Sequence, residues 1–217
     1  MIFEIVVLAL ASTVRPTSLA AVCALVTQGT RRRLMWAYVL AGLMFTLAFG
    51  AIVVGATHGI HVHSGKTKGI ADLAGGLVAL GFGVAILTGR IRGDRPDDAP
   101  KAGDRMRAVL DRRLTVRTAA LAGPATHVPG IFYLIALNLI VTHNAAIADK
   151  TVALVVYNAV WFAIPLAALA VCIVRPAAAP ALLEAVEQWT RTHARGILLL
   201  VSFGAGAALV VRGILAL

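Results

Sequence analysis

The chain has 217 residues, of which 59% are hydrophobic and 14% are charged, and its mean hydropathy is +0.87. Soluble domains are about 45–50% apolar and about 25% charged, so this composition excludes a soluble globular protein and indicates an integral membrane protein. The net charge of +10 does not indicate nucleic-acid binding. The basic residues lie in the gaps between apolar runs, where lysine and arginine set the orientation of a membrane protein.

Six apolar runs predict six transmembrane helices. A helix needs about 20 apolar residues to cross a bilayer, and a backbone in lipid must satisfy its own hydrogen bonds, so we expect an all-α fold. The predicted spans are residues 2–27, 34–56, 69–89, 119–142, 151–173 and 196–216.

The first span carries Arg15 and Pro16 near its middle. An arginine at that depth costs roughly 2.5–3.5 kcal/mol on insertion scales, and the proline breaks or kinks the helix there. A guanidinium with few acidic neighbours in sequence is suited to hold a phosphate, sulfate or carboxylate group, so Arg15 is the main candidate for substrate binding. The alternative is a structural arginine bonded to carbonyls that the breaks leave free. Ser12 and Thr13 either add hydroxyl contacts to a substrate or cap the broken helix.

The gap after the second span contains three histidines, followed closely by an aspartate. Such spacing can bind zinc or copper, but no cysteine or tetrahedral ligand pattern accompanies it. The sequence therefore predicts no metal or other cofactor and leaves only weak candidate ligands, which are His58, His61, His63 and Asp72.

Lysine and arginine are concentrated in the gaps after the first, third and fifth spans. The opposite side holds only Lys66, Lys68, Lys150 and Arg212. This bias predicts that both termini lie outside the cell and that the long basic segment lies in the cytoplasm.

Two cytoplasmic stretches place apolar residues on one helical face. Residues 103–117 lie in the basic loop 90–118, and residues 180–194 precede the last span. Both are predicted to be amphipathic helices on the inner leaflet, with a solvated charged linker as the alternative for the loop.

The fourth span is interrupted at Gly123–Gly130, where Pro124 and Pro129 predict a second unwound segment. Unwinding frees backbone amides that can bind an anionic group, beside Thr126 and His127. The histidine either couples transport to protons or is a hydrogen-bonded structural residue. Further polar groups in the fourth and fifth spans are interpreted as lining a cavity or bonding between helices, namely Tyr133, Asn138 and Asn158.

The two halves of the chain are predicted to be inverted repeats. Each half has three spans, so residues 119–217 must lie upside down relative to residues 1–89. Leu10–Pro16 is echoed by Leu121–Pro129, and Gly81–Gly83 by Ser202–Gly204. Interrupted helices at matching positions of two halves indicate the binding site of a transporter.

The six spans, the proline breaks in the first and fourth, and the long basic loop resemble the lysine-exporter superfamily. Within it, the chain is most similar to the glycopeptidolipid-addressing and sulfolipid-addressing proteins of acid-fast bacteria. The resemblance covers nearly the whole chain and rests mainly on Ser12–Pro16 and Gly123–Gly130. It implies export of small solutes or help in moving large envelope glycolipids. Arg15-Pro16-Thr17 replaces the small-Pro-Gly-Pro pattern typical of amino-acid exporters in this superfamily, which argues against amino-acid export.

These observations predict a transporter of the bacterial inner membrane that exports an anionic or glycosylated envelope lipid by alternating access. The expected partners are membrane lipids, the lipid or small-molecule substrate, and a second copy of the chain or a lipid-export machinery. Two alternatives stay open: a proton-coupled exporter of an amino acid or metal cation, and a non-transporting accessory protein. No nucleophile and base can be paired from these spacings, so no enzyme activity is predicted.

Overall fold

The computed structural model describes residues 2–13, 15–26, 31–57, 65–90, 115–143 and 145–217. Every regular element in these ranges is a helix. In chain order they are α1 (Ile2–Thr13), α2 (Pro16–Val26), α3 (Arg31–Thr57), α4 (Gly65–Leu87), α6 (Val116–Thr126), α7 (Ile131–Thr142), α8 (Ile147–Trp161), α9 (Ala163–Val174) and α10 (Ala179–Leu215).

Three pairs of consecutive helices are sharply bent at a short break. The bend is 63° between α1 and α2, 68° between α6 and α7, and 61° between α8 and α9. Among the described residues, two unbroken helices are long and apolar enough to cross a membrane, and up to five spans result if each bent pair counts as one. The third predicted span lies in α4, whose apolar part, Asp72–Leu87, is shorter. The chain is therefore an all-α membrane protein.

Proline and its neighbours explain where the helices stop. Pro16 is the first residue of α2, a position where the missing amide hydrogen costs nothing. The second break is shorter than predicted: Pro124 lies inside α6, which continues to Thr126, and Pro129 and the N-cap Gly130 separate α6 from α7. The bend in the fifth span was not predicted. Pro165 explains it, because proline cannot donate to the carbonyl of Trp161 four residues earlier.

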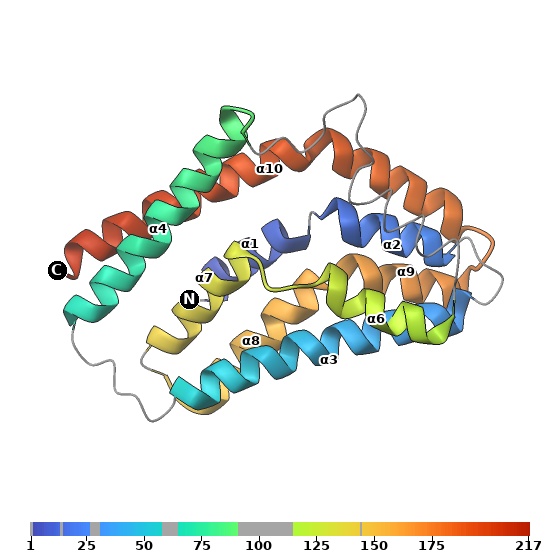
Figure 1. Cartoon of the computed structure of the whole chain (residues 1–217), viewed down its shortest axis with the longest axis horizontal. Coiled ribbons are helices and arrows are strands. Elements are labelled where there is room, and N and C mark those ends of the chain that lie inside the picture. Colours follow the sequence, from blue (N-terminus) through green and yellow to red (C-terminus); the bar gives the residue numbers. More distant parts are fainter. Residues whose placement is uncertain (1, 14, 27–30, 58–64, 91–114, 144) are drawn as a thin grey trace.

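The apolar core is divided in two at the level of the breaks. One core cluster is built mainly from α1, α7 and α8, and the other mainly from α2, the start of α3 and α9, with residues of α6. These two sets occupy opposite ends of the molecule in Figure 1. Each broken span thus gives one half to each core cluster, and buried polar side chains such as Ser18 and His127 lie near the breaks.

Helices α4 and α10 pack closely along one edge of the molecule, opposite α3 and α6 (Figure 1). Gly76 lies so close to Gly206 that a Cβ atom on it would be 2.8 Å from the carbonyl oxygen of Gly206. Small residues therefore hold these helices in backbone contact. The segment 180–194, expected as an interfacial helix, is the first part of α10, which continues without a break to Leu215. The other expected amphipathic helix, 103–117, lies almost entirely outside the described residues.

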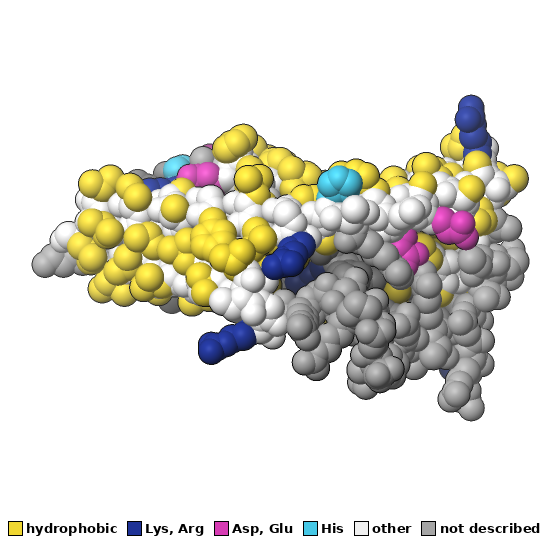
Figure 2. All heavy atoms as spheres, turned by 90° about the horizontal axis from the view of Figure 1, so that it is seen from above, with side chains coloured by type: hydrophobic (Ala, Val, Ile, Leu, Met, Phe, Trp, Pro, Cys, Tyr) yellow, Lys and Arg dark blue, Asp and Glu magenta, His cyan; other side chains and the backbone are white. Residues whose placement is uncertain are grey.

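The surface is apolar where it can be seen. Figure 2, which is seen from the edge formed by α4 and α10, shows many hydrophobic side chains spread over the described surface at the left end of the molecule. Large apolar residues such as Phe3, Ile52 and Leu200 are more than two-thirds exposed. A soluble protein rarely shows so much contiguous apolar surface, whereas a bilayer accepts it.

Candidate functional site at three helix breaks

Arg15 lies in the first break and contacts the other two. Its Nη1 donates a hydrogen bond of 2.8 Å to the carbonyl oxygen of Val128 in the second break. Its Nη2 lies so close to Gly130 that a Cβ atom there would collide with it. Its Cζ atom is 5.2 Å from the ring centroid of Trp161, at the third break. One guanidinium therefore connects all three bent spans.

The positive charge of Arg15 is not neutralised by a carboxylate within the described residues. The ion pairs found there instead involve Arg212, at the end of α10. Arg15 is partly exposed. Among the described residues, its guanidinium makes one hydrogen bond, to the carbonyl oxygen of Val128. Because a guanidinium has five N–H donors, this arrangement leaves donors for an anionic group.

Ser12 and Thr13 attach the end of α1 to α8. The hydroxyl of buried Ser12 is hydrogen-bonded to the hydroxyl of Tyr157. The Thr13 hydroxyl lies 2.9 Å from the carbonyl oxygen of Ala9 and 3.1 Å from that of Val160, both of which can accept its hydrogen. Both hydroxyls thus make protein contacts that fix the position from which Arg15 extends.

His127 lies at the start of the second break and is buried, with only 1% of the residue exposed. Its ring stacks on Phe162 with 4.1 Å between centroids and an interplanar angle of 18°. The Nδ1 atom is 3.0 Å from the carbonyl oxygen of Gly123, and Nε2 is 3.4 Å from the Ser18 hydroxyl. Since a carbonyl only accepts, these partners assign the hydrogen to Nδ1 and an acceptor role to Nε2.

Thr126 belongs to the same buried network. Its hydroxyl donates to the carbonyl oxygen of Ala122 at 2.8 Å, and the Tyr38 hydroxyl lies 2.8 Å from the Thr126 oxygen. The same Tyr38 hydroxyl is 3.1 Å from Ser18. The network therefore joins α2, α3 and α6 on one side of the breaks.

Tyr133 and Asn158 lie on the other side of the breaks. The Tyr133 hydroxyl donates to the carbonyl oxygen of Thr46 at 2.6 Å, and its ring centroid lies 5.1 Å from that of Tyr157. Asn158 donates from Nδ2 to the carbonyl oxygen of Leu154 at 2.8 Å, while its buried Oδ1 has no hydrogen-bond partner among the described residues.

The remaining candidates contribute less to this cluster. Pro129 lies within the second break, beside the Val128 carbonyl that Arg15 binds. Pro16 begins α2, and its side chain lies outside the described part of the structure. Asn138 is half-buried on α7, and within the described residues its side chain makes no hydrogen bond to the other candidates.

The weak metal candidates separate into two groups. His58, His61 and His63 lie outside the described residues. Asp72 is buried in α4, with Oδ2 3.9 Å from Nε of Arg212, and Arg212 also donates to Glu4 at 2.8 Å. Within the described ranges, no group of three or more histidines, cysteines or acidic residues is placed to hold a metal ion.

Three aromatic residues of the site were not predicted: Tyr38, Trp161 and Phe162. A usable signal existed for Trp161, because tryptophan is enriched at membrane interfaces whereas this one lies near the middle of a predicted span. Pro165, three residues after Phe162, was the corresponding signal for the third break.

Comparison with known proteins assigns the chain to one family. No curated protein and no solved structure gives a significant match to the chain. The family model described as Sap, sulfolipid-1-addressing protein, matches residues 5–215, which include all nine described helices except the first residues of α1. The match covers nearly the whole chain, and the protein therefore belongs to the sulfolipid-1-addressing protein family.

Proposed function

We propose that this protein translocates an anionic or glycosylated lipid across the bacterial inner membrane toward the cell envelope, with Arg15 binding the anionic headgroup. The observation that carries the proposal is the position of the Arg15 guanidinium between three helix breaks, without a carboxylate partner among the described residues. A charged side chain within a membrane span is energetically unfavourable and therefore indicates a functional role. Membership of a lipid-addressing family supports a lipid as its ligand.

The surroundings of Arg15 orient its guanidinium for binding an anionic group. Trp161 covers the guanidinium on one side through a cation–π contact, and the Val128 carbonyl fixes one of its nitrogens. The other donors are then held in a defined orientation rather than moving with a free side chain. A phosphate or sulfate ester can accept two of them at once.

The proposed topology has six spans in two inverted halves, with both termini outside. The contacts between helices support this arrangement because they occur in matching pairs. Helix α1 packs on α8 as α6 packs on α3, and α2 contacts α10 as α7 contacts α4. In an inverted repeat, the first, second and third spans correspond to the fourth, fifth and sixth. Under this correspondence, the two contacts of each pair are equivalent.

The proposed mechanism is alternating access around the breaks, with one half rocking against the other. The polar side chains around the breaks lie between the two core clusters, where a headgroup would pass from one side of the membrane to the other. The hydrogen bonds of Ser12, Thr13, Thr126 and His127 keep the broken ends in place, so the moving parts are half-helices rather than unwound chain.

The experiment is native mass spectrometry with lipid extraction on gently solubilised protein, comparing the wild type with Arg15→Ala. We expect an anionic phospholipid or glycolipid to co-purify with the wild type and to be lost from the variant. Arg175→Ala, in which an exposed arginine at the end of α9 is removed, is the matched control and should retain the lipid. Equal retention by all three proteins would contradict the role of Arg15.

A purely accessory role is the second possibility that this family leaves open. It is tested separately, since an accessory protein can bind lipid without moving it. Purified protein in liposomes that moves a labelled anionic lipid unaided excludes that role. Saturable flux of an amino acid or metal cation in the same liposomes would instead favour the small-solute alternative.

A further inference from the structure

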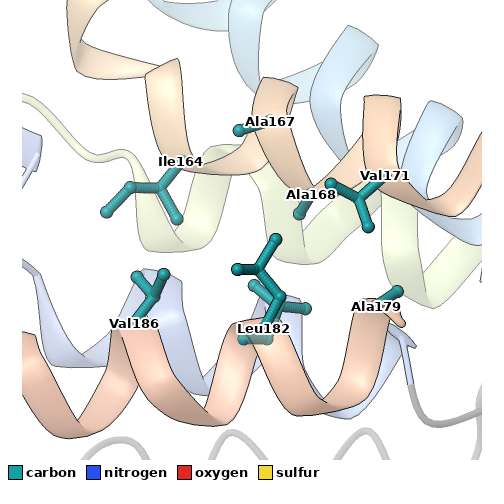
Figure 3. A pocket seen from close by; sticks show the side chains of 8 residues that line it. Ile164, Ala167, Ala168, Val171, Ala179, Leu182 and Val186 are labelled. Atoms are coloured by element: carbon teal, nitrogen blue, oxygen red, sulfur yellow. The ribbon is translucent and has the colours of Figure 1, made fainter. Parts of the chain in front are cut away.

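An apolar pocket lies between α9 and the first part of α10, in the half of the molecule that holds the second core cluster. Figure 3 shows side chains from the two helices pointing toward one another across it. Its lining consists entirely of aliphatic residues: Ile164, Ala167, Ala168, Val171, Ala179, Leu182, Leu183 and Val186.

The pocket begins next to the breaks. Ile164 is the second residue of α9 and comes two residues after Phe162; Trp161 and Phe162 contact Arg15 and His127 respectively. Helix α2, whose first residue follows Arg15, contacts both α9 and α10. From Ile164 to Val171 the pocket extends over eight residues of helix, a rise of about 10 Å.

The pocket is also open to the surroundings of the protein. Leu182 is 49% exposed, and Ala167 is exposed as well. A lining without donors or acceptors does not hold water, so a pocket of this kind in a membrane protein is suited to hydrocarbon. The exposed residues give a chain in the bilayer a lateral route into it.

We infer that this pocket holds part of one hydrocarbon chain of the lipid whose headgroup binds Arg15. The inference rests on the proposed function, and it adds a second recognition element that selects for an acyl chain rather than for charge. The ligand is then held at two points, with its anionic group at the breaks and its chain between α9 and α10. Small residues on both helices, such as Ala168 and Ala179, leave the space for the chain.

The test uses phosphatidylglycerol that carries a photoreactive diazirine on one acyl chain, in phosphatidylcholine liposomes containing the whole protein. Labelled peptides are mapped by mass spectrometry in the wild type and in two variants. Ala167→Phe places a ring in the pocket, whereas Ala170→Phe places the same ring on the same helix at an exposed position outside it. We expect Ala167→Phe to reduce labelling of α9 and α10 by about tenfold, equivalent to lost burial of roughly two methylene groups.

The control Ala170→Phe should label like the wild type. Labelling that is unchanged in Ala167→Phe, or that falls equally in both variants, would overturn the assignment of the pocket. Arg15→Gln is measured alongside with anionic and zwitterionic probes. If it loses the preference for phosphatidylglycerol, the headgroup proposal holds whatever the pocket does; if it keeps that preference while Ala167→Phe loses labelling, the headgroup proposal fails and the pocket stands.

Discussion

At the scale of single residues, Arg15 is the side chain on which the site depends. Its hydrogen bond to Val128 and its contact with Trp161 place one charge at three breaks that are far apart in the sequence. Gly130 makes this possible, because any side chain at that position would occupy the space of the guanidinium. The close approach, and not backbone conformation, is what requires glycine there.

Gly130→Ala is therefore expected to displace Arg15 while leaving the chain folded. Loss of a hydrogen bond to a charged group costs about 1.5–3 kcal/mol, so retention of an anionic lipid should fall by about tenfold or more. The measurement is the lipid-to-protein ratio after purification. Gly81→Ala is the control, since a Cβ atom at Gly81 meets nothing within 4 Å, and wild-type behaviour of Gly130→Ala would contradict this account of Arg15.

The environment of His127 favours a structural role over proton coupling. Asparagine at this position can donate to the Gly123 carbonyl as Nδ1 of the histidine does, although it loses the stacking on Phe162. His127→Asn should therefore keep most of the lipid transport and its pH dependence. A pH profile recorded from pH 5 to 8 that becomes flat in the variant would instead identify His127 as the proton-coupling group.

The sequence drew attention to Arg15 in the first break and to the prolines of the second, because arginine and proline are rare and costly within a span. It could not predict that they meet. The contact between Arg15 and Val128 joins residues 113 positions apart, and only the packing of the bent helices brings them together. Tyr38 and Phe162 were missed because a tyrosine or phenylalanine in a span carries no signal that separates a site from a core.

At the scale of elements, small residues determine which helices can approach one another. Gly123 of α6 crosses α3 at Gly42, and a Cβ atom on Gly123 would be 2.8 Å from the amide nitrogen of Gly42 and would also collide with the carbonyl oxygen of Tyr38. The crossing lies just before Thr126 and His127, so it also sets the position of the second break. The analogous contact at the other edge is that of Gly76 with Gly206.

Gly123→Ala should force α3 and α6 apart and destabilise the protein by about 1–3 kcal/mol, as overpacked cores do. The free energy of unfolding in detergent, or the unfolding midpoint, measures the effect. Gly55→Ala on α3 has open space around the new Cβ atom and serves as the control. An unchanged unfolding midpoint in Gly123→Ala would contradict the close contact between α3 and α6.

The all-helical fold could be predicted from the sequence because lipid permits few alternatives to a helix. The bends in the first and fourth spans could be predicted because proline interrupts a helix. The bend after Trp161 and the continuity of α10 through residues 179–215 could not. In the first case Pro165 lies three residues beyond the bend, and in the second the charged residues before Gly196 suggested a separate interfacial helix. Both outcomes depend on packing between helices, which a single sequence does not display.

At the scale of the whole molecule, polar contacts connect the halves at two levels. The first is the layer around Arg15, between the two core clusters. The second lies at the end of α10, where Arg212 pairs with Glu4 of α1 at 2.8 Å and lies 3.9 Å from Asp72 of α4. The second contact joins the first and last helices of the chain.

Arg212→Gln should destabilise the protein, because it leaves the buried carboxylate of Asp72 without this nearby cation. Adding Asp72→Asn removes that buried charge and should restore part of the lost stability, as seen in the unfolding midpoint of the double variant. Arg175→Gln is the control, at an exposed arginine. Additive losses in the double variant would contradict a coupling between Arg212 and Asp72.

The most direct test of the central claim is translocation of a fluorescent phosphatidylglycerol by the purified protein in liposomes, read from the fraction of probe that becomes accessible to a quencher outside. We expect transfer by the wild type and by Gly81→Ala, and loss of that transfer in a folded, correctly inserted Arg15→Gln protein. Transfer by Arg15→Gln at the wild-type rate would contradict the claim that Arg15 carries the headgroup across.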